Sequence, residues 1–98
     1  MSSVYSVSDI QRILYPIFTA HSVRRAVLFG SYAKGCATER SDIDLLVDSG
    51  LHGLSFFGLL ESVSSAFRQS VDLIDVTQVE NDSDIQREIN NSGVQIFG

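Results

Sequence analysis

Three kinds of feature are scarce in this chain of 98 residues, and each shortage excludes a class of protein. The single cysteine, Cys36, rules out an internal disulfide and favours a reducing compartment. One proline and seven glycines argue against a disordered or low-complexity chain. No run approaches the ~20 apolar residues that span a bilayer, and Met1–Ser8 lacks the basic start and apolar run of a secretory signal. We therefore expect a cytoplasmic protein without a membrane segment.

Basic residues are scarce too, with seven Lys and Arg against twelve Asp and Glu and a formal net charge of −5. Binding to a nucleic-acid duplex needs clustered basic side chains that displace counterions. Here only Arg24 and Arg25 are adjacent, so we expect no direct binding to nucleic acid. An acidic chain can still bind a phosphate-bearing ligand through a metal ion, or a basic protein partner.

Hydrophobic residues make up 44% of the chain, which is ordinary for a globular protein, and the length suits one domain over residues 1–98. The hydrophobic periodicity predicts a mixed α/β fold, with helices packed on a small sheet. The expected elements are helix 9–20, strand 25–29, a short helix after Ser31, strand 42–47, helix 55–67, strand 71–76, helix 84–90 and a candidate edge strand 94–97.

Several local expectations follow from this pattern. Ser8 is the expected N-cap of the first helix, and Pro16 should kink that helix or shorten its last turn. Asp48 should be a solvated strand end. Phe57 is most simply a core residue, although Phe57 or Tyr32 could instead belong to a surface that faces a partner.

The residues that can carry chemistry lie where two expected strands meet. One strand ends at Gly30-Ser31, and the next opens with Asp42 and Asp44. Their side chains point the same way, and their Cα atoms are about 6.5–7 Å apart. Alone, this pair could be a solvated strand edge. Two such carboxylates repel each other unless a cation sits between them, and oxygen-only ligands favour Mg²⁺ or Mn²⁺.

A third carboxylate, Asp72, opens the following strand and would join the first two if the strands are neighbours. Asp75 is the alternative, but strand alternation should turn it to the other face. Three converging carboxylates can hold two metal ions for in-line phosphoryl displacement, with Asp72 able to accept the proton of the attacking hydroxyl.

Gly30 and Ser31 have the properties of a phosphate-binding turn. A residue without a side chain lets the backbone approach a phosphate, and Ser31 offers a hydroxyl at a helix start. Lys34 could add a positive charge one turn later. The segment is not a Walker A loop, because Cys36-Ala37 stand where that loop requires Lys and Ser or Thr.

Residues 27–35 (VLFGSYAKG) and 41–47 (SDIDLLV) together resemble the signature of the DNA polymerase β-like nucleotidyltransferase superfamily. The pattern is Gly-Ser, ten residues, then Asp-x-Asp, and residues 71–74 (VDLI) resemble the strand of the third carboxylate. Within the superfamily, the chain looks most like the minimal nucleotidyltransferases of bacteria and archaea. The resemblance implies that Ser31 binds the triphosphate, that Asp42 and Asp44 bind metal, and that Asp72 completes the site.

Many minimal members resemble antitoxins that act on a small helical partner of the HEPN class. The resemblance therefore implies transfer of AMP from ATP to a hydroxyl acceptor, such as a tyrosine of that partner. Larger relatives carry an extra substrate-binding domain, for which this chain has no room, so acceptor recognition should rest on a partner. One alternative is a catalytically weak module that neutralises its partner by binding alone. A third reading, an antibiotic-modifying transferase, ranks last because it needs the second domain.

Overall fold

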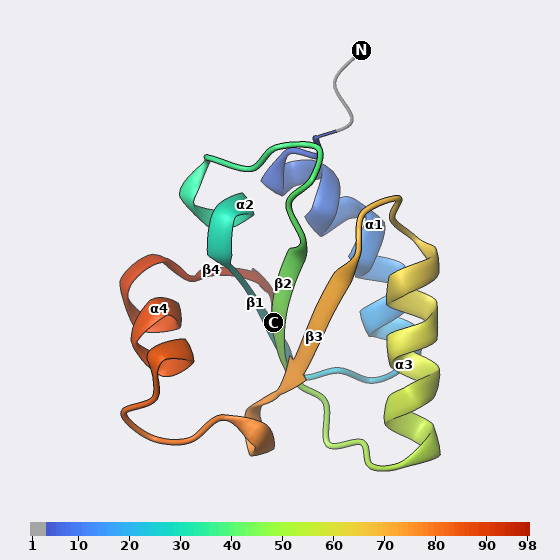
Figure 1. Cartoon of the computed structure of the whole chain (residues 1–98). Helices are drawn as coiled ribbons and strands as arrows, with labels where there is room; N and C mark the ends of the chain where they lie inside the picture. The colour runs from blue at the N-terminus through green and yellow to red at the C-terminus, as the bar shows by residue number, and fades with distance from the viewer. Residues whose placement is uncertain (1–3) are drawn as a thin grey trace.

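Four strands form one mixed sheet in the order β3-β2-β1-β4 (Figure 1). The computed structural model describes residues 4–98. β1 is antiparallel to β2 and β4, whereas β2 and β3 are parallel, because the chain between them crosses over through a helix. The predicted mixed α/β fold, including the edge strand at the carboxyl end, is thus confirmed. The strands are β1 (Arg25–Phe29), β2 (Ile43–Asp48), β3 (Val71–Asp75) and β4 (Val94–Phe97).

Two long helices, α1 (Val7–Ala20) and α3 (Leu54–Ser65), cover one face of the sheet (Figure 1). Apolar side chains on both helices pack on alternate strand residues, which gives the main hydrophobic core. Helices and strands each bury one side against this core, and the sequence therefore shows their hydrophobic periodicities. Its fully buried residues include Ile10, Leu14, Phe18, Leu28, Ile43, Leu45, Val47, Leu59 and Val63.

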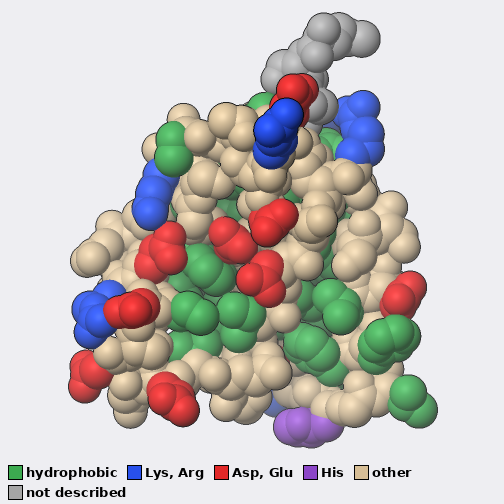
Figure 2. Space-filling view, viewed as in Figure 1, with side chains coloured by type: hydrophobic (Ala, Val, Ile, Leu, Met, Phe, Trp, Pro, Cys, Tyr) green, Lys and Arg blue, Asp and Glu red, His purple; other side chains and the backbone are tan. Residues whose placement is uncertain are grey.

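The second face of the sheet is covered only in part, by the short helix α2 (Gly30–Lys34), the 3-10 turn η1 (Val76–Gln78) and α4 (Asp84–Ser92). A smaller apolar cluster of Val27, Phe29 and Leu46 lies there, with Ile89 of α4 packed against it. In the space-filling view, acidic side chains gather beside this hydrophobic patch (Figure 2). This partly open face is where the predicted site lies.

The amino-terminal helix begins earlier than predicted but ends at Ala20, as predicted. It begins at Val7 with Ser6 as N-cap, because the Ser6 hydroxyl accepts from the Asp9 N–H while the Asp9 carboxylate accepts from the Ser6 N–H. The assignment of Ser8 as N-cap was therefore wrong. The helix also continues through Pro16 to Ala20, so the predicted shortening of its last turn does not occur.

Other corrections concern side chains at element ends. Asp42 lies just before β2 rather than inside it, while the strand extends to Asp48. Asp48 is not simply solvated, since its Oδ1 lies 3.6 Å from Nη1 of Arg24. Phe57 is 54% exposed, so its assignment to the core was wrong, whereas Tyr32 is buried and cannot form part of an exposed surface. α3 begins one residue earlier than predicted and ends at Ser65.

Within residues 4–98, no helix combines the length and apolar character needed to cross a membrane. Positions 1–3 of the amino-terminal segment, for which we expect no secretory signal, lie outside the described residues.

Asp75 is buried at the end of β3 and ties two loops together. Its Oδ1 accepts hydrogen bonds from the N–H and the hydroxyl of Ser49, at 3.2 and 2.6 Å, and its Oδ2 accepts from the N–H and the hydroxyl of Thr77, at 3.0 and 2.8 Å. Burial raises the pKa of Asp75, but these hydrogen bonds outweigh it and hold the pKa below its usual value. Asp75 is a structural residue on the face opposite Asp72, as strand alternation predicted.

We expect Asp75→Asn to lower the free energy of unfolding by about 2–3 kcal/mol at neutral pH, because an amide cannot accept all four hydrogen bonds. Since the folded pKa is the lower one, the stabilisation by Asp75 is present above the unfolded pKa and is lost as the pH falls through the folded pKa. Urea unfolding at pH 7 and at pH 3 measures both effects. The exposed Asp72 on the same strand supplies the control, and equal losses in Asp75→Asn and Asp72→Asn would contradict the prediction.

Candidate active site

The register of the two parallel strands places Asp44 of β2 directly beside Asp72 of β3. Ile43, Leu45 and Val47 of β2 are buried in the main core, so alternation turns Asp44 to the open face of the sheet. Asp44 is half-buried, whereas Asp72 and Asp42 are exposed. The structure therefore brings the predicted carboxylates to one end of one face.

The pKa of Asp44 reflects the acidic groups around it. Burial, followed by repulsion from Asp72, Asp42 and Glu88, raises the pKa of Asp44 to about 6. A positive charge beside a carboxyl group would instead lower its pKa. The arrangement is therefore unfavourable without a cation, which is the expected property of a metal-binding site rather than of a structural one.

Gly30 lies against the carboxylate of Asp44. Its φ of +74° is strained for other residues, and a Cβ built on it would overlap Asp44 Oδ2 and lie 3.1 Å from Cγ. We predicted that a glycine here lets the backbone approach a phosphate. The structure adds that the glycine leaves room for Asp44. Ser31 follows in the first turn of α2 and is half-buried.

The chemistry of the three aspartates fits a hard divalent cation. All their ligand atoms are oxygens, as Mg²⁺ prefers. In the part of the chain that the structure describes, no group of three His, Cys, Asp or Glu side chains is close enough to hold a metal ion by itself. This does not conflict with the fit, because Mg²⁺ is commonly bound by one or two carboxylates together with substrate phosphates and water.

Two charged residues flank the site from α2 and α4. Lys34 Nζ lies 3.1 Å from Oε1 of Glu88, and repulsion from Glu88 contributes to the raised pKa of Asp44. The sequence indicates Lys34 as a charged residue near the phosphate turn, but it gives no indication of Glu88. No local pattern marks Glu88, since it lies 44 positions after Asp44 in the sequence and reaches the site only because α4 packs against α2.

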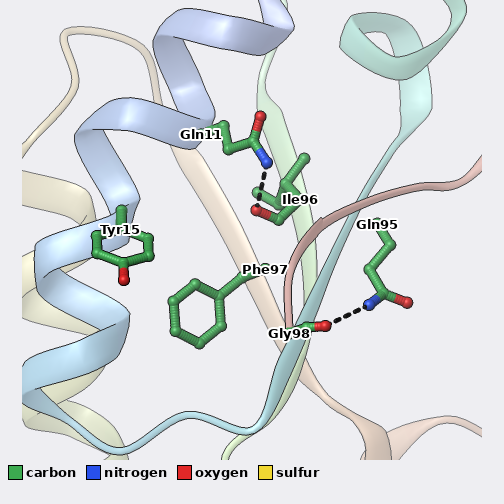
Figure 3. A pocket seen from close by; sticks show the side chains of 6 residues that line it. All are labelled: Gln11, Tyr15, Gln95, Ile96, Phe97 and Gly98. Carbon is green, nitrogen blue, oxygen red and sulfur yellow. Dashed lines mark hydrogen bonds between the residues drawn. The ribbon is translucent and has the colours of Figure 1, made fainter.

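Two hollows formed by residues 4–98 do not contain these aspartates. One of about 490 Å³ lies between α1 and β4, where Gln11 Nε2 donates to the carbonyl of Ile96 and Tyr15 stands near Phe97 (Figure 3). A second, of about 270 Å³, lies on the open face of the sheet and is lined mainly by apolar residues such as Val27 and Leu46. The carboxylates mark the candidate site better than the size of a hollow does, because the chemistry needs charged groups.

Comparison with known proteins agrees with this geometry. The protein-family model described as polymerase beta, nucleotidyltransferase matches residues 12–98. The chain belongs to this family. The match includes the Gly30-Ser31 turn and all three aspartates, so the predicted resemblance is confirmed for nearly the whole chain. The residue roles within this nucleotidyltransferase remain predictions.

Relatives come from the archaeon Methanocaldococcus jannaschii, and each is named as a candidate protein adenylyltransferase. One is 47% identical over 45 residues, which cover 46% of this chain and 48% of that protein. In this pair the match thus spans about half of the relative's length. Another is 33% identical over 84 residues, which cover 83% of this nucleotidyltransferase and 86% of the relative.

Two solved structures with a similar fold are described as toxin-antitoxin complexes. One, described as a toxin-antitoxin with AMP-PNP, has a TM-score of 0.75 at 24% identity and covers 90% of this chain and 73% of that chain. Another holds the tri-AMPylated HEPN toxin of Shewanella oneidensis in complex with MNT antitoxin. Its TM-score is 0.70 at 21% identity, with 94% of this chain and 72% of that chain covered. At these identities the likeness shows the nucleotidyltransferase fold.

We expect Asp44→Asn to stabilise the metal-free protein at pH 7 by about 1 kcal/mol after allowance for solvent screening, because it removes a charge that its neighbours repel. The folded pKa of Asp44, about 6, lies above the ordinary value of 3.8, so the native carboxyl favours folding at low pH and loses that contribution as the pH rises through about 6. Thermal unfolding in EDTA at pH 4 and pH 7.5 measures this difference. Glu61→Gln, an exposed change on α3, controls for net charge, and an equal gain there would refute a local cause.

A second pair of variants tests the packing of Gly30. Both Gly30→Ala and Gly35→Ala place a side chain at a positive φ, which costs about 1–2 kcal/mol. Only the first also overlaps Asp44, since nothing lies within 4 Å of a Cβ at Gly35. We expect Gly30→Ala to lose about 1–2 kcal/mol more than Gly35→Ala in urea unfolding, in the range of an overpacked site. Equal losses of unfolding free energy in the two variants would show that the overlap with Asp44 adds no cost.

Proposed function

We propose that this chain is a metal-dependent nucleotidyltransferase that transfers AMP from ATP to a hydroxyl group. The observation that carries the proposal is the pairing of Asp44 with Asp72 in the parallel register, beside Gly30 and in reach of repulsion from Asp42. Membership of the nucleotidyltransferase family supports it. The names of the archaeal relatives and the AMP-PNP in a structure of similar fold support ATP as the donor.

Each residue has a role in the proposed reaction. Gly30 and Ser31 bind the triphosphate through backbone N–H groups and the serine hydroxyl, while Asp42 and Asp44 bind Mg²⁺ or Mn²⁺ and Asp72 completes the set. The bound cation would neutralise phosphate charge and lower the pKa of the acceptor hydroxyl. The hydroxyl oxygen forms a bond to the α-phosphorus as the bond to the β-phosphate oxygen breaks. Pyrophosphate leaves and Asp72 takes the hydroxyl proton.

The acceptor in this proposal is a tyrosine hydroxyl of a HEPN-type protein, and the chain acts as the antitoxin of that protein. The support is the fold shared with a complex whose toxin is described as tri-AMPylated and whose partner is an MNT antitoxin. A phenol hydroxyl becomes a good nucleophile once it is deprotonated, and a carboxylate such as Asp72 at a metal site can assist this step.

A second candidate function is neutralisation of a partner by binding alone. Leu54 and Phe57 of α3 are 89% and 54% exposed, which is unusual for large apolar side chains placed one turn apart. Such a pair suits a protein interface, where aromatic anchors contribute most of the binding energy. The two functions are compatible, since a transferase must also hold its acceptor.

We expect Asp42→Ala combined with Asp44→Ala to abolish Mg²⁺-dependent binding of ATP and to reduce AMP transfer at least a hundredfold, because the phosphates lose their cation. Calorimetric titration of ATP with Mg²⁺ measures binding, and labelled ATP with a HEPN-type partner measures transfer. Glu61→Ala combined with Glu80→Ala removes the same charge from exposed positions and should leave both unchanged.

The outcome also separates the two candidate functions. AMP transfer that persists in the variant with both Asp42→Ala and Asp44→Ala would contradict the transferase proposal. A double variant that no longer transfers AMP but still suppresses the toxin would favour neutralisation by binding, and Phe57→Asp should then weaken the complex.

A further inference from the structure

Lys34 lies one helical turn after Ser31 of the phosphate turn formed by Gly30 and Ser31. It is the last residue of α2, three positions after Ser31, and residues at this spacing are neighbours on a helix surface. Helix side chains lean toward the amino terminus of the helix, which here is the end that carries Ser31. The ammonium group ends 3.1 Å from Glu88 Oε1, where Lys34 is 49% and Glu88 is 34% exposed.

Glu88 reaches this place from a different part of the chain. It belongs to α4, which packs against α2 on the open face of the sheet and buries no residue fully. The ion pair with Lys34 places the Glu88 carboxylate at the end of α2, the helix that begins at the predicted phosphate turn, and its charge contributes to the raised pKa of Asp44. A fourth carboxylate beside a triphosphate site opposes anion binding unless it serves another purpose.

Stability does not explain the pair. An exposed Lys–Glu pair typically contributes only about 0–1 kcal/mol, because solvent screens the charges and both side chains lose freedom. An unheld lysine would lose about 2 kcal/mol of rotamer entropy on binding a phosphate. A lysine already held by a carboxylate has less freedom left to lose, and its ammonium keeps two of three N–H donors for phosphate oxygens. Protein kinases hold their phosphate-binding lysine with a helix glutamate in the same way.

We propose that Glu88 is a positioning residue for the nucleotide, which holds the Lys34 ammonium beside the β- and γ-phosphates. The inference rests on the proposed nucleotide site and adds a residue to it. Glu88 acts through Lys34 and touches neither the α-phosphate nor the acceptor. Its contribution therefore concerns the affinity for a triphosphate and not the affinity for AMP.

Binding of Mg²⁺-ATP and of AMP to the whole chain tests this role in the unaltered protein, Glu88→Gln, Lys34→Met and the double variant. We expect Glu88→Gln to weaken binding of Mg²⁺-ATP about three- to tenfold while AMP changes less than about twofold, as for the loss of one oriented ion pair. The double variant should bind no more weakly than Lys34→Met alone. Asp48→Asn removes the partner of Arg24 in a comparable exposed pair outside the site, and should leave ATP binding unchanged.

Each other outcome is decisive. Equal or tighter binding of Mg²⁺-ATP by Glu88→Gln overturns the role of Glu88, because the carboxylate would then be a bystander or a competitor for Lys34. Additive losses in the double variant overturn the coupling through Lys34. If the unaltered protein binds no ATP, the proposed function itself fails. If ATP binds equally well with and without the Glu88 carboxylate, only the role of Glu88 fails.

Discussion

The parallel register of β2 and β3 is the constraint on which the open face of this molecule depends. It sets Asp44 beside Asp72, where burial and neighbouring acids raise the pKa of Asp44 to about 6. Such repulsion is a cost to folding that another part of the structure must offset. The opposite face does so, with apolar side chains of α1 and α3 fully buried on the sheet. One face thus supplies stability and leaves the other free for an unfavourable cluster of charge.

Asp44 and Asp75 show that the same fold treats two carboxylates in opposite ways. Asp75 lies on the core side and receives hydrogen bonds from Ser49 and Thr77, which hold its pKa low. Asp44 lies on the open side among other acids, against a glycine that allows close approach. The difference is one of surroundings and not of residue type. A carboxylate that the protein satisfies is structural, whereas one that needs an added cation indicates a binding site.

Local patterns predicted much of this arrangement. Alternation along 43–47 determined which side of β2 is buried, and Gly30-Ser31 with Asp-x-Asp identified the site, because both depend on neighbours in the sequence. Features set by tertiary packing were missed. Glu88 reaches the site through the docking of α4 on α2, and Phe57 is exposed because the rotation of α3 depends on what it packs against. Ser6 and Ser8 both offer a cap, and only the Asp9 hydrogen bonds decide between them.

The geometry also limits how an acceptor can approach in the proposed reaction. Triphosphate bound at Gly30 and Ser31 lies at the end of β1, on the side of the sheet face that α2 and α4 flank. In-line displacement requires the attacking oxygen to come from the side opposite the leaving pyrophosphate. Asp72, which takes the hydroxyl proton in the proposed reaction, is exposed on β3, an edge strand of the sheet. An acceptor that approaches Asp72 meets the start of β3, whereas Phe57 lies in the first turn of α3, where Gly53 and Phe56 line a hollow with Asp75 at the end of β3. The proposed catalytic site and the exposed apolar pair therefore lie toward opposite ends of β3, so a partner held by Phe57 would have to extend along this edge strand to present its hydroxyl to Asp72.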